Sequence, residues 1–371
     1  MPFLSLSIYN FRNLKNETID LNSKEVFFVG ENGQGKSNLL EALYYSAYGS
    51  SFRERIDSRI VKNNQENFSL ISMYTNEKEN LQRIKIIYEN KKKHIEKNGK
   101  KIQNRKELVN TIPCVVFCHD DMNFAIGSPE FRRYFIDQTL TMHDSLYLEN
   151  LINYKKILKS RNLILQNKQY EMLPVYNSMI AKNGLEIQKK RKKAIFQINE
   201  IFGKLYEEIS GIEGIYVEYL PSWKEIQEDL KKRLCTEEEI LSFLKEKEEQ
   251  DKILGTTYYG PHKDKIVFVK DKKNFIQTAS TGQCRLISLL LRISQAVYYK
   301  RVTGINPVIL MDDVMLELDP KKREKFISMI PDYDQLFCTF MPGEPYENYK
   351  RQNSKIYKIE NGEWFLDGKF N

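Results

Sequence analysis

Long hydrophobic runs are missing from this sequence, and so are paired cysteines. No stretch of its 371 residues holds the roughly eighteen apolar residues that a membrane-spanning helix needs. The N-terminus has no secretory signal pattern. The five cysteines form no C-x-x-C pair, and an odd number argues against a disulfide framework or a zinc ribbon. These features predict a cytoplasmic protein with reduced thiols.

Internal repeats and low-complexity tracts are also missing, which excludes solenoid and disordered classes. With 41% hydrophobic and 29% charged residues, the chain has the composition of a globular protein. Its length favours two domains, or one domain with an insertion. The net charge of +8 is mild but unevenly spread, so local basic clusters matter more than the total.

The most informative stretch is 30–37, which matches G-x-x-x-x-G-K-S between an apolar run (26–29) and a helix-like run (38–44). A glycine-rich turn before a helix N-terminus is the phosphate-binding P-loop, whereas a solvated turn is the alternative. Lys36 is expected to meet the β- and γ-phosphates, and Ser37 to bind Mg²⁺. The predicted nucleotide-binding residues are Gly30, Glu31, Asn32, Gly33, Gln34, Gly35, Lys36, Ser37 and Asn38.

A second half of the site is expected where the apolar run 307–311 ends in Asp312 and Asp313. This is the Walker B arrangement. Asp312 would hold Mg²⁺ directly or through water, and Asp313 would polarise the attacking water. Alone this pattern is common at strand ends, but together with the P-loop it indicates phosphoryl chemistry.

The segment 279–283, Ala-Ser-Thr-Gly-Gln, directly precedes a regular helical pattern. It can be an ordinary Ser/Thr helix cap. It can also be the signature motif of an ABC-type ATPase, in which Ser280, Gly282, Gln283 and the helix N-terminus bind the γ-phosphate held by another subunit. One P-loop and one signature per chain then require a homodimer. Residues 317–320 would form the D-loop of that interface.

Strand patterns occupy both ends of the chain, at 4–8, 83–88, 94–97 and 113–117 and again from about residue 258, with Asn98-Gly99 as a hairpin turn. From about residue 131 to 250 the pattern is helical and charged. The sequence therefore predicts an α/β domain (1–125 and 251–371) with an inserted helical arm (126–250).

Basic clusters suggest a second kind of ligand. The run 189–193 would encircle more than one helical turn, and lysines line the hairpin 91–101. A solvated face or a charged sheet edge is the ordinary explanation. Contact with a nucleic-acid backbone is the other. The residues of the run are Lys189, Lys190, Arg191, Lys192 and Lys193.

Taken in order along the chain, these motifs resemble the RecF family of bacterial recombination mediators, relatives of the SMC and Rad50 heads. The resemblance rests on Asn10-Phe11-Arg12-Asn13-Leu14, the P-loop with Asn38, the signature and the Asp-Asp pair. It also rests on 127–133 with its double arginine (Arg132, Arg133), followed by Asp137, and on Tyr259-Gly260-Pro261-His262-Lys263-Asp264. The chain is too short for SMC coiled coils and lacks a Rad50 zinc hook.

The resemblance implies an ABC-type P-loop ATPase head with an inserted helical arm, using ATP and Mg²⁺. It implies a homodimer on ATP binding, binding to double-stranded or gapped DNA at single-strand/double-strand junctions, and slow hydrolysis that releases the DNA. It implies work with RecR and RecO to help load RecA. It also places Arg12 at the nucleotide, although spacing alone gives an ordinary surface arginine.

Some positions depart from the family pattern. His119, Asp120, Asp121 and Met122 stand where the family commonly has Pro-Glu-Asp-Leu, in the Q-loop region, and Lys263 replaces an arginine. Thr281 replaces a glycine of the signature, and Thr339 stands where transporter ATPases carry a switch histidine. Two other functions stay open at this point. A metabolic P-loop kinase would leave the signature and arm unexplained, and a structural module would use ATP only as glue.

Overall fold

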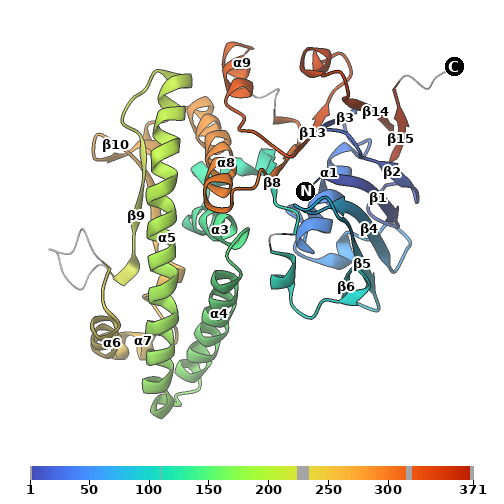
Figure 1. Cartoon of the computed structure of the whole chain (residues 1–371). Coiled ribbons are helices and arrows are strands. Elements are labelled where there is room, and N and C mark those ends of the chain that lie inside the picture. Colours follow the sequence, from blue (N-terminus) through green and yellow to red (C-terminus); the bar gives the residue numbers. More distant parts are fainter. Residues whose placement is uncertain (1, 110, 224–233, 315–319, 368–371) are drawn as a thin grey trace. The chain divides into compact units, whose positions relative to one another are not determined.

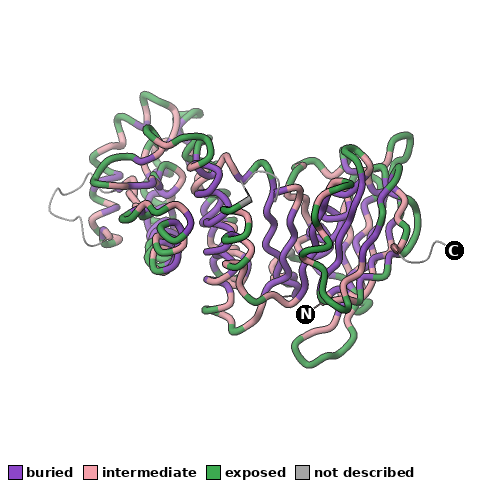
Figure 2. The backbone as a smooth tube through the Cα atoms, turned by 90° about the horizontal axis from the view of Figure 1, so that it is seen from above, coloured by how far each residue is buried: buried purple, intermediate pink, exposed green. Residues whose placement is uncertain are grey.

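The computed structural model describes residues 2–109, 111–223, 234–314 and 320–367. The chain folds into two compact units, one of residues 1–121 with 295–371 and one of residues 122–294. Among the described residues, no helix has the length and apolar character needed to cross a membrane. In Figure 2 buried residues follow the strands and helices of each unit, and exposed residues gather at the loops.

The first unit contains an antiparallel sheet in the order β2-β1-β4-β5-β6-β7. Buried and partly exposed residues alternate regularly in β4, as a strand with one face in the core requires. The strands are β1 (Phe3–Tyr9), β2 (Thr18–Asp20), β4 (Phe68–Thr75), β5 (Leu81–Glu89), β6 (Lys92–Lys97) and β7 (Lys100–Lys101).

The turn between β6 and β7 is the predicted Asn98-Gly99 hairpin. Both residues have positive φ, 52° and 79°, and Lys97 pairs with Lys100 across the turn. Positive φ at both central positions is typical of the type I′ turn, which favours Asn-Gly. The hairpin prediction is therefore confirmed.

The second sheet of this unit has the order β15-β14-β3-β13-β12-β8, and all its pairs are parallel except β14–β15. Every residue of β3, β8, β12 and β13 is buried, which matches their mainly apolar sequences. The strands are β3 (Glu25–Val29), β8 (Cys114–Phe117), β12 (Val308–Met311), β13 (Gln335–Phe340), β14 (Lys355–Glu360) and β15 (Glu363–Leu366).

Helix α1 (Lys36–Tyr48) packs against strands of both sheets, so it is the centre of the first unit's core (Figure 1). The turn 30–35 joins β3 to the N-terminus of α1. Helix α9 (Pro320–Ser328) lies between β12 and β13 in the sequence. Because β3, β12 and β13 are parallel, their C-terminal ends meet at one edge of the sheet, where α1 begins.

The second unit is mainly helical. Its longest element is α5 (Leu173–Ser210), which has 38 residues and a buried face that includes Ile195, Ile198 and Phe202. A helix here agrees with the helical pattern expected for this part of the chain. The other helices are α2 (Met122–Ile126), α3 (Pro129–Thr141), α4 (Ser145–Gln166), α6 (Glu237–Glu246), α7 (Glu248–Leu254) and α8 (Thr281–Thr303). A small antiparallel sheet joins β9 (Tyr216–Leu220), β10 (Lys265–Lys270) and β11 (Lys273–Asn274).

The division between the units differs from the boundary expected after residue 250. Strand β10 pairs along its length with β9, from Lys265 opposite Leu220 to Val269 opposite Tyr216. Residues 251–294 belong to the helical unit, so the chain returns to the first unit only within α8, at residue 295.

Candidate functional site

The turn between β3 and α1 has the geometry that its glycines predict. Gly33 and Gly35 have φ of 80° and 116°, values that side chains other than glycine rarely tolerate. Gly30 is needed for a different reason, because a Cβ at this position would collide with the main-chain oxygen of Ile359. The turn therefore presents main-chain N–H groups and the N-terminus of α1 in the arrangement that binds phosphate.

Lys36 lies inside this turn. Its side chain is 4% exposed, and its ammonium group donates to the main-chain oxygens of Gly30 at 2.7 Å and Glu31 at 3.2 Å. The same nitrogen lies 4.0 Å from an oxygen of Asp313. A buried cation whose ligands are mostly neutral carbonyls is suited to exchange them for phosphate oxygens.

The second half of the predicted site meets the first. The hydroxyl of Ser37 donates to Asp312 Oδ1 at 2.6 Å. Asp313 Oδ1 accepts a hydrogen bond from the hydroxyl of Thr339 at 2.7 Å, and the N–H of Asp313 donates back to Thr339 at 2.8 Å. The structure thus brings Lys36, Ser37, Asp312 and Asp313 together at the sheet edge and fixes Asp313 at two points.

Oxygen atoms dominate this arrangement, which suits Mg²⁺. Burial raises the pKa of Asp312 above its ordinary value, and the charge of Asp313 adds to the rise, whereas the Ser37 hydrogen bond and Arg53 oppose it. A divalent cation beside Asp312 would favour the charged carboxylate. Within the described residues no group of three or more His, Cys, Asp or Glu side chains could hold a metal. Ser37 and Asp312 together would offer two oxygen ligands.

Polar side chains surround the start of α1. Arg12 donates through two nitrogens to Glu41, at 2.9 and 2.7 Å, and Glu41 is fully buried. Asn38 donates to Asn13 Oδ1 at 2.8 Å and accepts from Arg53 at 3.1 Å. Asn38 lies in the first turn of α1, directly after the P-loop. Arg12 pairs with Glu41 further along the same helix, and its contact with the nucleotide stays a prediction. Arg53 was not predicted because no motif marks it.

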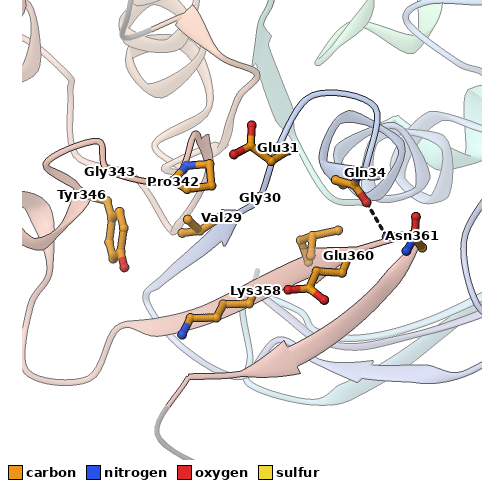
Figure 3. Close-up of a pocket in the computed structure, with 11 residues that line it drawn as sticks. Val29, Gly30, Glu31, Gln34, Pro342, Gly343, Tyr346, Lys358, Glu360 and Asn361 are labelled. Carbon is orange, nitrogen blue, oxygen red and sulfur yellow. Dashed lines mark hydrogen bonds between the residues drawn. The ribbon is translucent and has the colours of Figure 1, made fainter.

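Gln34 and its neighbours form one wall of a cavity of about 490 Å³ (Figure 3). The side chain of Gln34 accepts the N–H of Asn361 at 2.6 Å, which attaches the β14–β15 turn to the P-loop. The cavity is lined by Val29, Gly30, Glu31, Gln34, Pro342, Gly343, Tyr346, Lys358, Ile359, Glu360 and Asn361. Asn32 is exposed on the same turn.

The signature segment belongs to the second unit and begins α8. Ser280 and Gln283 form a reciprocal cap, in which Ser280 N–H donates to Gln283 at 2.7 Å and Gln283 N–H donates to the Ser280 hydroxyl at 3.3 Å. Ser280, Thr281 and Gly282 are exposed. This is the cap that the simpler interpretation expected, and it leaves the helix N-terminus open to a ligand. The proposed D-loop residues 317–319 lie outside the described residues.

The cationic run on α5 does not form a single exposed surface. Lys189, Lys190, Lys192 and Lys193 are exposed, and the first two pair with Glu186 and Asp144, each at 2.8 Å. Arg191 instead points into the unit, is 3% exposed, and pairs with Asp137 at 2.9 Å and Asp264 at 3.0 Å. The expectation that all five cations face DNA is therefore wrong for Arg191, which is part of a buried ion-pair network.

The double arginine has mainly main-chain partners. Arg132 donates to the oxygens of Ala125 and Gly127, both at 3.0 Å, and Arg133 donates to the oxygen of Asp264 at 2.9 Å. Both are about half-buried, and burial lowers the pKa of each guanidinium. Their contact with DNA stays a prediction.

The Gly-Pro-His segment lies in the same unit, with Gly260, Pro261 and Asp264 buried and Lys263 exposed. Asp264, which is fully buried, also accepts hydrogen bonds from Tyr219, Gln188 and the N–H of Ser222. In the Q-loop region, Asp121 accepts the N–H of Cys118 at 3.0 Å, while His119 and Asp120 are exposed. Asp121 therefore stabilises the 3-10 helix that follows β8, His119–Asp121.

Comparisons with known proteins agree with this geometry. Residues 3–364 match the family model described as the RecF/RecN/SMC N terminal domain. The chain is 44% identical to the DNA replication and repair protein RecF of Treponema pallidum over 96% of its own length and 99% of that protein's. It is 32% identical to the RecF of Leptospira interrogans, covering 96% and 97%.

Solved structures give the same result. A structure of the recombination mediator protein RecF-ATP in the RecFOR pathway matches with a TM-score of 0.88 and 26% identity, over 98% of this chain and 97% of that one. A crystal structure of an Smc head bound to a domain of ScpA matches with a TM-score of 0.57 at 15% identity, over 99% and 97% of the two chains. At that identity the Smc match concerns the fold alone.

Proposed function

The chain belongs to the RecF family, and on that premise we propose that it is an ATP-dependent DNA-binding protein of recombinational repair. Family membership confirms the resemblance drawn from the motifs and the expected fold class, an α/β ABC-type P-loop ATPase head with an inserted helical arm. The general role in DNA replication and repair follows from the same membership. The observation that carries the proposal further is the convergence of Lys36, Ser37, Asp312 and Asp313 at one sheet edge.

ATP is the nucleotide that we propose for this turn, with Mg²⁺ as its counter-ion. Mg²⁺ bound with ATP supplies charge neutralisation at the phosphates. Lys36 binds phosphate oxygens in place of its present main-chain partners, and Ser37 and Asp312 offer oxygen ligands to the cation. Asp313, held by Thr339, orients a water molecule toward the terminal phosphate.

Two protomers are needed for a complete site in this proposal. Ser280 and Gly282 lie at the exposed N-terminus of α8, where main-chain N–H groups favour an anion. We propose that this turn binds the terminal phosphate held by the P-loop of a second copy. ATP binding then produces a homodimer, and slow hydrolysis separates it.

DNA is the proposed macromolecular ligand, as duplex or as gapped duplex with single-strand/double-strand junctions. The exposed lysines of α5 (Lys189, Lys190, Lys192, Lys193) support this, because lysines of one helical region can contact successive phosphates. DNA stimulates ATP hydrolysis in the proposal. The partners RecR and RecO, and the loading of RecA, rest on family membership alone.

The test is sedimentation and size-exclusion of the full chain with ATP and Mg²⁺, with and without a gapped duplex. Wild type is expected to dimerise with ATP and to release DNA as ATP is hydrolysed. Asp313→Asn is expected to bind ATP and stay dimeric on DNA, because its water is no longer polarised. Lys36→Arg is the control for phosphate contact and is expected to stay monomeric.

Two results would contradict the proposal. One is an ATP-dependent dimer of unchanged strength in Lys36→Arg. The other is a DNA affinity that does not fall with salt, since each neutralised phosphate should contribute a slope of about 0.9 in log affinity against log salt.

A further inference from the structure

The chain makes a closed turn directly after β13, at residues 341–344. The N–H of Glu344 donates to the oxygen of Met341 at 3.2 Å, and Gly343 has a φ of 84° after Pro342. Proline followed by glycine with positive φ is typical of a type II turn. The side chain of Glu344 then closes the turn from the other direction, because its carboxylate accepts the N–H of Met341.

This turn lies against the P-loop. The main-chain oxygen of Phe340, the last residue of β13, accepts the N–H of Gly30 at 3.1 Å. The sulfur of Met341 lies 3.6 Å from the Lys36 ammonium. The carboxylate of Glu344 therefore bonds to the main chain of the residue whose sulfur contacts the phosphate-binding lysine.

The carboxylate of Glu344 lies within electrostatic range of the site's charged groups. Burial raises its pKa, and Asp313 adds to the rise, whereas the Met341 hydrogen bond, Arg323 and Lys36 oppose it. Asp313 lies 4.0 Å from the Lys36 ammonium, and Glu344 bonds to the main chain of Met341, whose sulfur contacts the same ammonium. No sequence motif marks Glu344, and neither the P-loop nor the Walker B pattern includes it.

We propose that Glu344 is a positioning and specificity-determining residue of the nucleotide site, which holds the main chain of the turn beside Lys36 and weakens the hold on the terminal phosphate of ATP. The inference rests on the proposed function, because it concerns the same P-loop. A negative charge on this turn, which lies against the P-loop, repels the added charge of a third phosphate, and this repulsion affects ATP more than ADP. Glu344 thus lowers the preference of the site for ATP over ADP.

Two substitutions separate the charge from the hydrogen bond. Glu344→Gln keeps an oxygen that can accept the N–H of Met341 but removes the charge. Glu344→Ala removes both, so the turn is no longer closed by a side chain. If Glu344 only closes the turn, Glu344→Gln should bind ATP with the same affinity as the wild type. If its charge opposes ATP, Glu344→Gln should bind ATP more tightly.

The experiment measures dissociation constants of a non-hydrolysable ATP analogue and of ADP by calorimetry, with Mg²⁺ and the full chain. Glu344→Gln is expected to tighten the analogue about threefold to tenfold and to change ADP by less than about twofold. Glu344→Ala is expected to bind the analogue less tightly than Glu344→Gln does, because it also loses the hydrogen bond to the N–H of Met341. The matched control is Glu347→Gln, because Glu347 lies on the next turn, is 58% exposed and pairs with Lys350 at 3.6 Å.

The outcomes are separable. If wild type binds the analogue and Glu344→Gln leaves the ATP-to-ADP ratio unchanged, this inference is wrong and the proposed function stands. If Gln and Ala weaken both nucleotides equally, Glu344 is a structural residue only, which also overturns the inference. If wild type binds neither nucleotide, the proposed function fails together with it.

Discussion

At the scale of single residues, Thr339 explains how Asp313 is held in place. Asp313 has a φ of 52°, a left-handed conformation that is uncommon for residues other than glycine. Its N–H and its carboxylate both bond to the Thr339 hydroxyl, at 2.8 and 2.7 Å. A hydroxyl that both donates and accepts can hold a strained aspartate in this way. Thr339, which stands where transporter ATPases carry a histidine, therefore has a definite contact with the catalytic candidate.

His262, in the second unit, is a partly buried neutral imidazole. Its Nε2 lies 3.0 Å from the main-chain oxygen of Thr257, so it carries the proton and donates. Its Nδ1 lies 2.8 Å from the hydroxyl of Tyr154 and accepts. Burial lowers the pKa of His262 to about 4, with the charges of Lys263, Arg133 and Arg191 acting in the same direction and the Thr257 hydrogen bond opposing them.

This low pKa predicts acid sensitivity of the second unit. Between about pH 6.5 and 4 the unfolded chain binds a proton at this histidine and the folded chain does not, so stability falls as the pH falls. The loss should approach about 1.4 kcal/mol per pH unit in this window and reach about 3 kcal/mol. His262→Gln, which lacks the titrating ring, should show a flatter pH dependence in urea unfolding between pH 7 and 4.5.

The chain has only two tryptophans, which gives a local probe for this measurement. Trp223 is fully buried in the second unit, so a Trp364→Phe background leaves it as the only tryptophan emitter. His94→Gln on β6 of the first unit is the control. Equal slopes of stability against pH in His262→Gln and its parent would show that His262 does not titrate as its burial requires.

At the scale of elements, helix α5 has an inward and an outward face within the same cationic run. Arg191 bonds to Asp137 through two nitrogens, both at 2.9 Å, and to Asp264 at 3.0 Å. Lys193, two residues further, is exposed. The two cations lie two residues apart on the same helix, one buried and one exposed, so they form a matched pair for mutation.

Arg191→Leu should destabilise the second unit strongly, because the fully buried carboxylate of Asp264 and the partly buried carboxylate of Asp137 then lose their cation. Removing one partner of a buried ion pair typically costs about 3–5 kcal/mol. Lys193→Leu should change the free energy of unfolding by less than about 0.5 kcal/mol, as surface substitutions usually do. Urea unfolding followed by Trp223 fluorescence measures both, and similar small changes in the two variants would contradict the burial of Arg191.

Some elements could be read from the sequence because their cause is local. The Asn98-Gly99 turn and the glycines of 30–35 are set by backbone conformations that few residues can adopt. The inward direction of Arg191 has no local signal, because its partners lie 54 and 73 residues away in sequence. The same holds for Gln34, whose side chain holds a turn 327 residues away.

At the scale of the whole molecule, the sequence predicted an inserted arm but not where it ends. The pairing of β10 with β9 assigns residues 251–294 to the second unit, and strand pairing at long sequence distance cannot be read from periodicity. A consequence is that the P-loop and the signature turn belong to different units, the first to residues 1–121 and the second to residues 122–294.

A mixing experiment tests whether two copies share each nucleotide site. Lys36→Ala removes the phosphate-binding cation, and Ser280→Arg places a bulky cation at the start of α8, so each variant alone should lose nearly all ATP hydrolysis. In a mixed dimer, the intact P-loop of the Ser280→Arg chain can meet the intact signature of the Lys36→Ala chain. One of two sites is then functional. At equal concentrations half of the dimers are mixed, so ATPase activity should recover to about a quarter of the wild-type value if dimers form at random and sites act independently. Activity that stays absent on mixing, while both variants remain folded, would show that the signature does not act across two chains.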